Sequence, residues 1–139
     1  MDNYELLLHD IKDILKTVDE VHRVSHGNPT PLDSEDQFTS IYISPTADSF
    51  ELISTGYDAS KYDNFIYIRL IINMDCSDDE LSWTRTRRKV IDAILNDSPI
   101  WSKIIDRDIV SAVHDDYSNY PRKTMELLFE FRIREDCVI

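Results

Sequence analysis

The sequence predicts an α+β fold, a mainly antiparallel sheet with two helices packed on one face. Two long runs of alternating apolar residues, 65–74 and 125–134, indicate strands that dominate the sheet. Two segments with apolar residues at three- and four-residue spacing, 3–17 and 80–96, indicate amphipathic helices. Short turns between neighbouring strands favour antiparallel pairing. The 139 residues are expected to form a single domain, 1–139.

The N-terminal part of the chain is predicted to contain a helix, a short strand and a long loop. The helix covers 3–17, with an apolar stripe along one face: Leu7, Ile11, Ile14, Leu15 and Val18. A short strand is expected at 20–25. The next segment, 26–37, has two prolines and almost no apolar residue, so it is predicted to be an exposed loop. Loops of that length in a compact domain are usually functional or disordered.

A β-hairpin with an extended tip is predicted in the middle of the chain. A strand at 38–44 ends at Pro45, and a second strand covers 50–56. The segment 57–64 connects it to the long strand at 65–75. Alternate residues of a strand share one face. The residues expected to face the helices are Ile66, Ile68, Leu70 and Ile72, and those expected to face away are Tyr67, Arg69 and Asn73.

The C-terminal part is predicted to contain the second helix and two closing strands. Ser77 and Glu80 fit a capping box before the helix at 80–96. Strands at 108–115 and 124–134 follow, joined by a turn containing a proline.

Composition narrows the possible functions. The net charge of −12, from 27 acidic and 15 basic residues, opposes sequence-independent nucleic-acid binding and favours solubility. Two glycines are too few for a glycine-rich phosphate loop. An acidic N-terminus predicts no signal peptide, and the apolar runs fall short of the roughly 20 residues that span a bilayer. Cys76 and Cys137 are expected to be free thiols in a reducing cytoplasm.

Histidine, acidic and cysteine residues raise three possible reactive sites, and none is favoured. His22 and His26 are four residues apart but lie outside a predicted helix. Asp106, Asp108 and the run His114-Asp115-Asp116 could form a carboxylate metal site, yet such clusters arise by chance in an acidic chain. Cys76, ahead of the second helix, has no evident histidine base. We therefore expect no enzyme activity, no metal and no cofactor.

One basic cluster stands out, on the second predicted helix. It consists of Arg85, Arg87, Arg88 and Lys89. A phosphate site is possible, but pairing with acidic residues of the same or a neighbouring subunit is favoured in so acidic a chain. Trp83 and Trp101 fit core anchors and interface anchors equally well.

The order of elements resembles the tail terminator, or tail completion, proteins of long-tailed bacteriophages. The similar features are the amphipathic first helix and the short strand before a proline-rich loop. The strand from Phe38 to Ser44 followed by Pro45, the long strand at 65–75 and the arginine-rich helix also match, as do the two closing strands.

The resemblance implies a structural protein of the virion tail, assembled in the host cytoplasm. It would form a ring of six that caps the tail tube, meets the head connector and lets DNA pass without specific binding. Candidate subunit contacts are Trp83, Arg85, Arg87 and Arg88, and candidate partner contacts are Asn28, Asp33, Glu35, Asp58 and Lys61. Strong repulsion between copies predicts weak association in dilute buffer and stronger association in salt.

Two alternatives remain open from the sequence. An acidic protein-binding adaptor or a DNA-mimic inhibitor would be a monomer or a dimer. A small metal-dependent hydrolase would use Asp106, Asp108 and His114.

Overall fold

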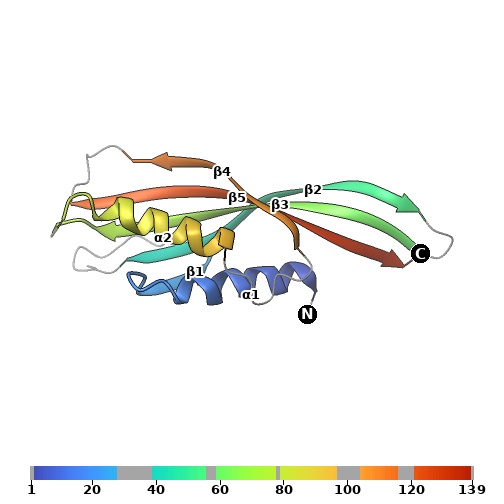
Figure 1. Ribbon diagram of the computed structural model, residues 1–139, viewed down its shortest axis with the longest axis horizontal. Helices are drawn as coiled ribbons and strands as arrows, with labels where there is room; N and C mark the ends of the chain where they lie inside the picture. The colour runs from blue at the N-terminus through green and yellow to red at the C-terminus, as the bar shows by residue number, and fades with distance from the viewer. Residues whose placement is uncertain are drawn as a thin grey trace.

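Five strands form one sheet in the order β1-β2-β3-β5-β4 (Figure 1). The computed structural model describes residues 2–27, 39–55, 59–77, 79–96, 104–115 and 121–138. The elements are α1 (Asn3–Lys16), β1 (Arg23–His26), β2 (Ser40–Thr55), β3 (Ala59–Asp75), α2 (Ser82–Asn96), β4 (Ile104–His114) and β5 (Arg122–Val138). All strand pairs are antiparallel except β1 with β2. The predicted α+β class is confirmed.

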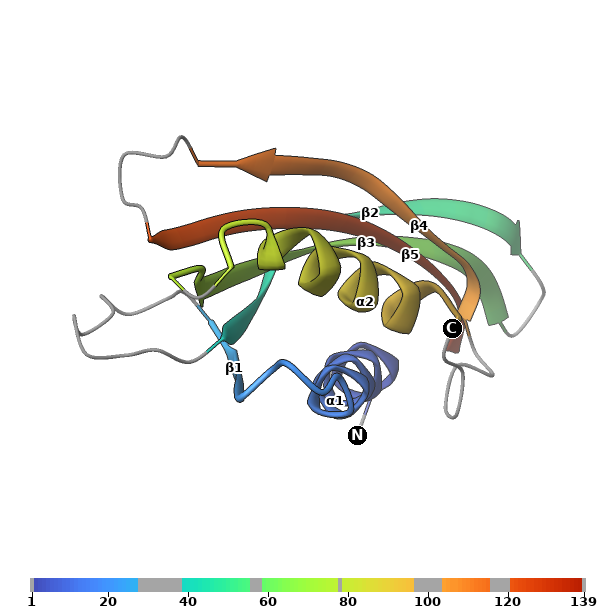
Figure 2. The ribbon, with the colours of Figure 1, turned by 60° about the vertical axis from the view of Figure 1, so that its left-hand side comes forward.

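Both helices lie on the same face of the sheet, as the sequence predicts (Figure 2). Helix α1 begins where Asp2 Oδ1 accepts a hydrogen bond from the Glu5 N–H at 2.8 Å, an N-cap that satisfies one of the free amides of the first turn. The predicted capping box before α2 is wrong. Helix α2 begins at Ser82, and Asp79 Oδ1 accepts from the Leu81 N–H at 3.0 Å in the turn that precedes it.

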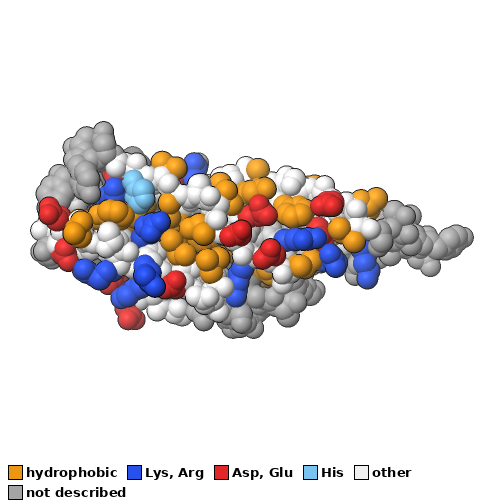
Figure 3. All heavy atoms as spheres, turned by 45° about the horizontal axis from the view of Figure 1, so that its top comes forward, with side chains coloured by type: hydrophobic (Ala, Val, Ile, Leu, Met, Phe, Trp, Pro, Cys, Tyr) orange, Lys and Arg blue, Asp and Glu red, His pale blue; other side chains and the backbone are white. Residues whose placement is uncertain are grey.

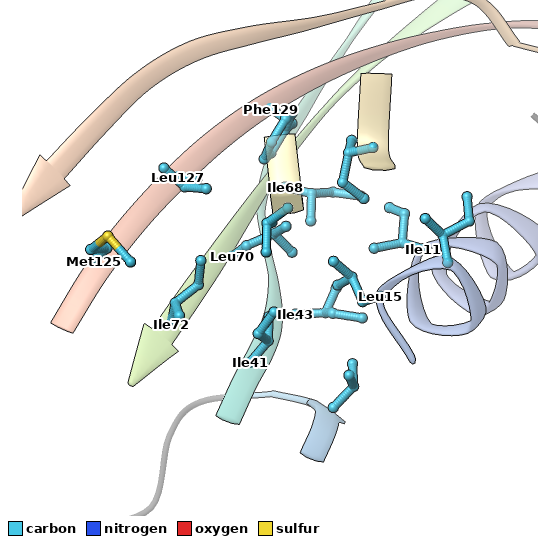
Figure 4. Packing of buried hydrophobic residues seen from close by; sticks show 14 of the residues in the cluster. Ile11, Leu15, Ile41, Ile43, Ile68, Leu70, Ile72, Met125, Leu127 and Phe129 are labelled. Atoms are coloured by element: carbon cyan, nitrogen blue, oxygen red, sulfur yellow. The ribbon is translucent and has the colours of Figure 1, made fainter. Parts of the chain in front are cut away.

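The core lies between the helices and the inner face of the sheet, meaning the face that carries α1 and α2 (Figure 4). Ile66, Ile68, Leu70 and Ile72 are all at most 1% exposed, so the predicted register of β3 is confirmed. They stand beside the β5 residues Phe131, Phe129, Leu127 and Met125, each paired across the two strands. Burying an aliphatic or aromatic side chain of this size contributes roughly 1.5–3 kcal/mol, so this double row dominates the stability.

The residues predicted to point away from the helices do lie on the outer face, but not all are exposed. Tyr67 and Arg69 are half-buried there, whereas Asn73 is only 7% exposed. The Thr124 Oγ1 hydroxyl and the Asn73 Oδ1 oxygen are 2.8 Å apart in a hydrogen bond between β3 and β5.

Strand β2 corrects the prediction of two strands interrupted at Pro45. It runs unbroken from Ser40 to Thr55, with an irregularity in pairing between Pro45 and Ala47. Strand β1 pairs only with the first four residues of β2, up to Ile43. Beyond that point this side of β2 has no neighbouring strand among the described residues, and a proline is tolerated at an edge or a bulge.

Two strand boundaries also differ from the prediction, and one strand pair is parallel. Strand β3 begins at Ala59, so most of the segment predicted as a connection belongs to the strand. Strand β4 begins at Ile104, ahead of the predicted start at residue 108. Strand β1 runs parallel to β2, because the long segment between them allows the chain to return to the same end of the sheet. The predicted loop at 26–37 lies outside the described residues from 28 onward.

The sheet continues past the helices at one end (Figure 1). There β2, β3 and β5 pair over their full length, Ala59 with Val138 and Thr55 with Ser60. Phe50, Leu52 and Ile53 of β2 are exposed in this part, which we call the projecting sheet.

Candidate interaction surfaces

Three arginines of α2 line one open depression of about 510 Å³. We call it the arginine depression; its lining is Thr84, Arg85, Arg87, Arg88, Ile91 and Asp92. The structure brings all three side chains to one hollow. Arg85 and Arg88 are exposed there, whereas Arg87 is half-buried.

Two of these arginines already have acidic neighbours on the same helix or its entrance. Arg85 contacts Asp79 at 2.9 Å, and Arg88 contacts Asp92 at 3.7 Å. The Arg88 side chain is 83% exposed, so its pairing contributes little to stability. The guanidinium can therefore exchange this partner for another carboxylate at small cost.

Trp83 and Lys89, the neighbours of the arginines, are engaged within their own subunit. The Trp83 ring meets His114 of β4 edge-on at 5.1 Å, and the Lys123 ammonium lies 4.8 Å from its centre. Lys89 Nζ contacts Glu20 Oε1 at 3.1 Å. These contacts fix α2 against the sheet and the end of α1. An intersubunit role for Trp83 stays a prediction.

His114 illustrates the positive surroundings at this end of α2. Burial and the nearby cations Lys123 and Arg87 lower the pKa of the His114 imidazole, and Asp115 opposes them. The imidazole is therefore harder to protonate than a free histidine. A neutral ring beside Trp83 suits packing rather than proton transfer.

A second depression, of about 520 Å³, lies between the start of α1 and the projecting sheet. Its lining combines acidic and aromatic residues and contains no base: Asp2, Asn3, Tyr4, Asp48, Phe50, Tyr62, Asn64 and Glu135. We call it the acidic depression. No local sequence pattern indicates this depression, because its residues come from α1, β2, β3 and β5.

The aromatic wall of the acidic depression is held in place by its own contacts. Phe50 and Tyr62 meet edge-on with ring centres 5.7 Å apart. The Tyr62 hydroxyl donates a hydrogen bond to Glu135 Oε2 at 2.7 Å. Burial and the negative charge of Asp48 raise the pKa of the Tyr4 hydroxyl. Tyr4 and Asp48 thus line the same negative hollow.

Asn64 of the acidic depression carries a buried acceptor without a donor. The residue is 4% exposed, and its Oδ1 atom has no hydrogen-bond partner among the described residues. A buried carbonyl oxygen left unpaired costs about 1–3 kcal/mol. An arriving N–H donor would remove that cost.

Acidic and basic side chains are interspersed on the face seen in Figure 3 and do not segregate. On the outer face of the sheet, the fully buried Asp63 carboxylate is paired with Arg132 and Arg134, and Arg69 lies 3.6 Å from Glu126. The acids on the face seen in Figure 3 therefore do not form one continuous negative strip.

The remaining predicted contact residues have mixed outcomes. Asn28, Asp33, Glu35 and Asp58 lie outside the described residues. Lys61 is exposed but belongs to β3, where the loop prediction is wrong, because it pairs with Ser54 and Asp136 in the sheet.

The residues considered for chemistry do not converge. In the register of β4 with β5, Asp106 lies opposite Arg132 and Asp108 lies opposite Glu130, on the outer face of the sheet. His114 instead packs against Trp83 on the inner face. Within the described residues no group of three or more His, Cys, Asp or Glu side chains could hold a metal ion. Cys76 is buried in the core, six residues before α2 begins at Ser82, so it lies further ahead of the helix than the sequence predicts. None of the described helices is long and apolar enough to cross a membrane.

The sequence matches no protein-family model and no curated protein. A solved structure described as "Virion of native gene transfer agent (GTA) particle" aligns with this chain at a TM-score of 0.46 and 14% identity. The alignment covers 95% of this chain and 91% of that chain. A TM-score of this size carries no inference about function, so function is argued from the chain's own residues.

Proposed function

We propose that this protein is a structural component of a phage-like virion, a tail terminator that forms a ring of six and caps the tail tube. The observation that carries the proposal is the projecting sheet. Phe50 and Leu52 are 63% and 62% exposed there, on the part of β2 that extends past the helices. Apolar side chains gathered on a rigid projection favour burial against another protein.

The arrangement of elements supports the same proposal. The chain runs from an amphipathic helix through a short strand and a long hairpin to an arginine-bearing helix and two closing strands. That order is the basis of the resemblance to tail terminators. The excess of acids, 27 against 15 bases, suits a ring through which DNA passes without being bound.

The free edges of the sheet favour specific contacts over indiscriminate strand pairing. Strand β4 is an edge strand, and its pairing is interrupted after Ile104 and after Ile109. It also carries Asp106 and Asp108 toward the outer face. Bulges and charges at an edge discourage addition of a further strand. Assembly is therefore expected to depend on side-chain surfaces, which the two depressions provide.

Mass photometry of the full chain over a concentration series, with negative-stain electron microscopy of any large species, tests the proposal. We expect closed rings of six copies, which add to tail tubes at one end and stop their growth. A chain that stays a monomer or dimer at every concentration, with or without tail tubes, would support the acidic adaptor instead. Metal-dependent cleavage of DNA, abolished by Asp108→Ala, would support the hydrolase.

A further inference from the structure

We propose that the arginine depression of one copy binds the acidic depression of the next, so that the ring closes head to tail. This inference rests on the proposed function and identifies the two surfaces that would join the subunits. A ring needs a heterologous contact, in which two different patches of the same chain fit each other. The chain provides one patch lined by arginines and one lined by acidic residues, so the two are complementary in charge.

The two patches lie toward opposite ends of the helical layer, as a head-to-tail contact requires. In Figure 1 α2 begins at the left of the view and α1 begins further to the right. The arginine depression is lined by residues from Thr84 to Asp92, between the first turn and the middle of α2. The acidic depression lies beside that start of α1, with Tyr4 in its lining. Copies stacked side by side in one orientation can therefore place one patch against the other.

The chemistry of the acidic depression fits a guanidinium group. Asp48 is exposed and forms no ion pair among the described residues, so its carboxylate is available. Phe50 and Tyr62 offer ring faces and edges on which a planar guanidinium can stack. Aromatic rings combined with carboxylates favour an arginine over a neutral side chain.

Asn64 provides an independent indication of a missing donor. Asn64 lines the acidic depression, and its buried Oδ1 accepts no hydrogen bond within the described chain. A guanidinium has five N–H donors, enough to serve Asp48 and Asn64 together. Acidity alone would not identify a ligand, whereas an unpaired buried acceptor specifies a hydrogen-bond donor.

Arg88 is the best candidate to reach into the acidic depression. Its side chain is 83% exposed, and Asp92, its ion-pair partner among the described residues, is 3.7 Å away. Arg85 is held more closely by Asp79, at 2.9 Å. A second copy is the favoured occupant because this chain itself carries the complementary arginines.

Charge reversal tests the pairing in three steps, with assembly measured by mass photometry. Arg88→Glu places an acid opposite Asp48, and Asp48→Lys places a base opposite Arg88, so each single variant should assemble at least tenfold more weakly than the parent chain. The double variant should recover assembly. A one-to-one mixture of the two single variants should also recover it, because alternating copies around a ring of six bring opposite charges together at every contact.

The matched controls are Arg23→Glu and Asp13→Lys, which make the same charge changes at exposed positions outside both depressions. They should assemble like the parent, and circular dichroism should show all variants folded. If the parent forms rings but the single variants form them equally well, or the double variant fails to recover, the pairing is wrong and the proposed function stands. If the parent never assembles, both are wrong.

Discussion

Asp63 on β3 and Arg134 on β5 are joined by a hydrogen bond from Arg134 Nε to Asp63 Oδ1 at 2.9 Å, directly across the two strands. The Asp63 carboxylate is fully buried, and Arg132 also donates to it. The pair lies on the outer face, where the projecting sheet leaves the helices. It holds β3 and β5 together on the outer face, which carries neither α1 nor α2.

Asp63→Asn should lower the free energy of unfolding by about 2–3 kcal/mol at neutral pH, because two guanidinium groups lose a charged acceptor. The two arginines lower the pKa of the Asp63 carboxyl below its ordinary 3.8. The contribution is therefore fully present above that value and is lost as the pH falls through the lowered pKa. Urea denaturation of both proteins at several pH values checks this. A difference that stays constant down to strongly acidic pH would contradict it.

Asp10→Asn should stabilise the protein at neutral pH, whereas Asp63→Asn destabilises it. Asp10 is 4% exposed, and burial followed by repulsion from Asp13 raises its pKa. A raised pKa means that ionisation costs stability once the pH exceeds the folded value, and the neutral amide avoids this cost. The gain should vanish as the pH approaches the ordinary carboxyl value. Thermal unfolding at neutral and acidic pH measures both effects, and a destabilised variant at neutral pH would refute the argument.

Thr86→Val should destabilise the fold by about 1 kcal/mol, since it removes one hydrogen bond and conserves volume. The buried Thr86 hydroxyl donates to Glu20 Oε2 at 2.6 Å and so ties α2 to the end of α1. This hydrogen bond is the largest cause of the lowered pKa of Glu20. NMR titration of Glu20 should therefore show its pKa rise in the variant. An unchanged pKa would mean that Lys89 alone holds the carboxylate.

Phe129→Ala and Phe50→Ala should separate folding from assembly. Phe129 is fully buried beside Ile68, so its truncation should cost about 3–5 kcal/mol of stability. Phe50 is 63% exposed, so its truncation should leave the monomer within about 0.5 kcal/mol. It should nevertheless weaken assembly, because the ring wall of the acidic depression is lost. Chemical denaturation paired with mass photometry distinguishes the two; normal assembly of Phe50→Ala would argue against a contact there.

The sequence predicted those features that depend on local periodicity. Alternation in β3 placed Ile68 and Leu70 in the core, and the three- and four-residue spacing placed Ile11 and Leu15 there. The proline rule failed at Pro45, because a strand can continue through a proline where it has a free edge and a bulge. The parallel pairing of β1 depends on a return path that local pattern does not encode.

The candidate surfaces were predicted only in part. The arginines of α2 are close in sequence and were recognised as a cluster. The acidic depression could not be predicted, because Tyr4, Asp48 and Glu135 are far apart in the chain. They come together only through the pairing of β2 with β3 and of β3 with β5.

Sedimentation velocity of the full chain, over a concentration series at low and physiological salt, tests the central claim of self-assembly most directly. The net charge of −12 per copy opposes association at low salt, and screening to about 8 Å at physiological salt relieves long-range repulsion more than it weakens pairs buried in a contact. We predict a monomer in dilute low-salt buffer and a species of six times the monomer mass as concentration and salt rise. A chain that never exceeds a dimer under any of these conditions would contradict the account.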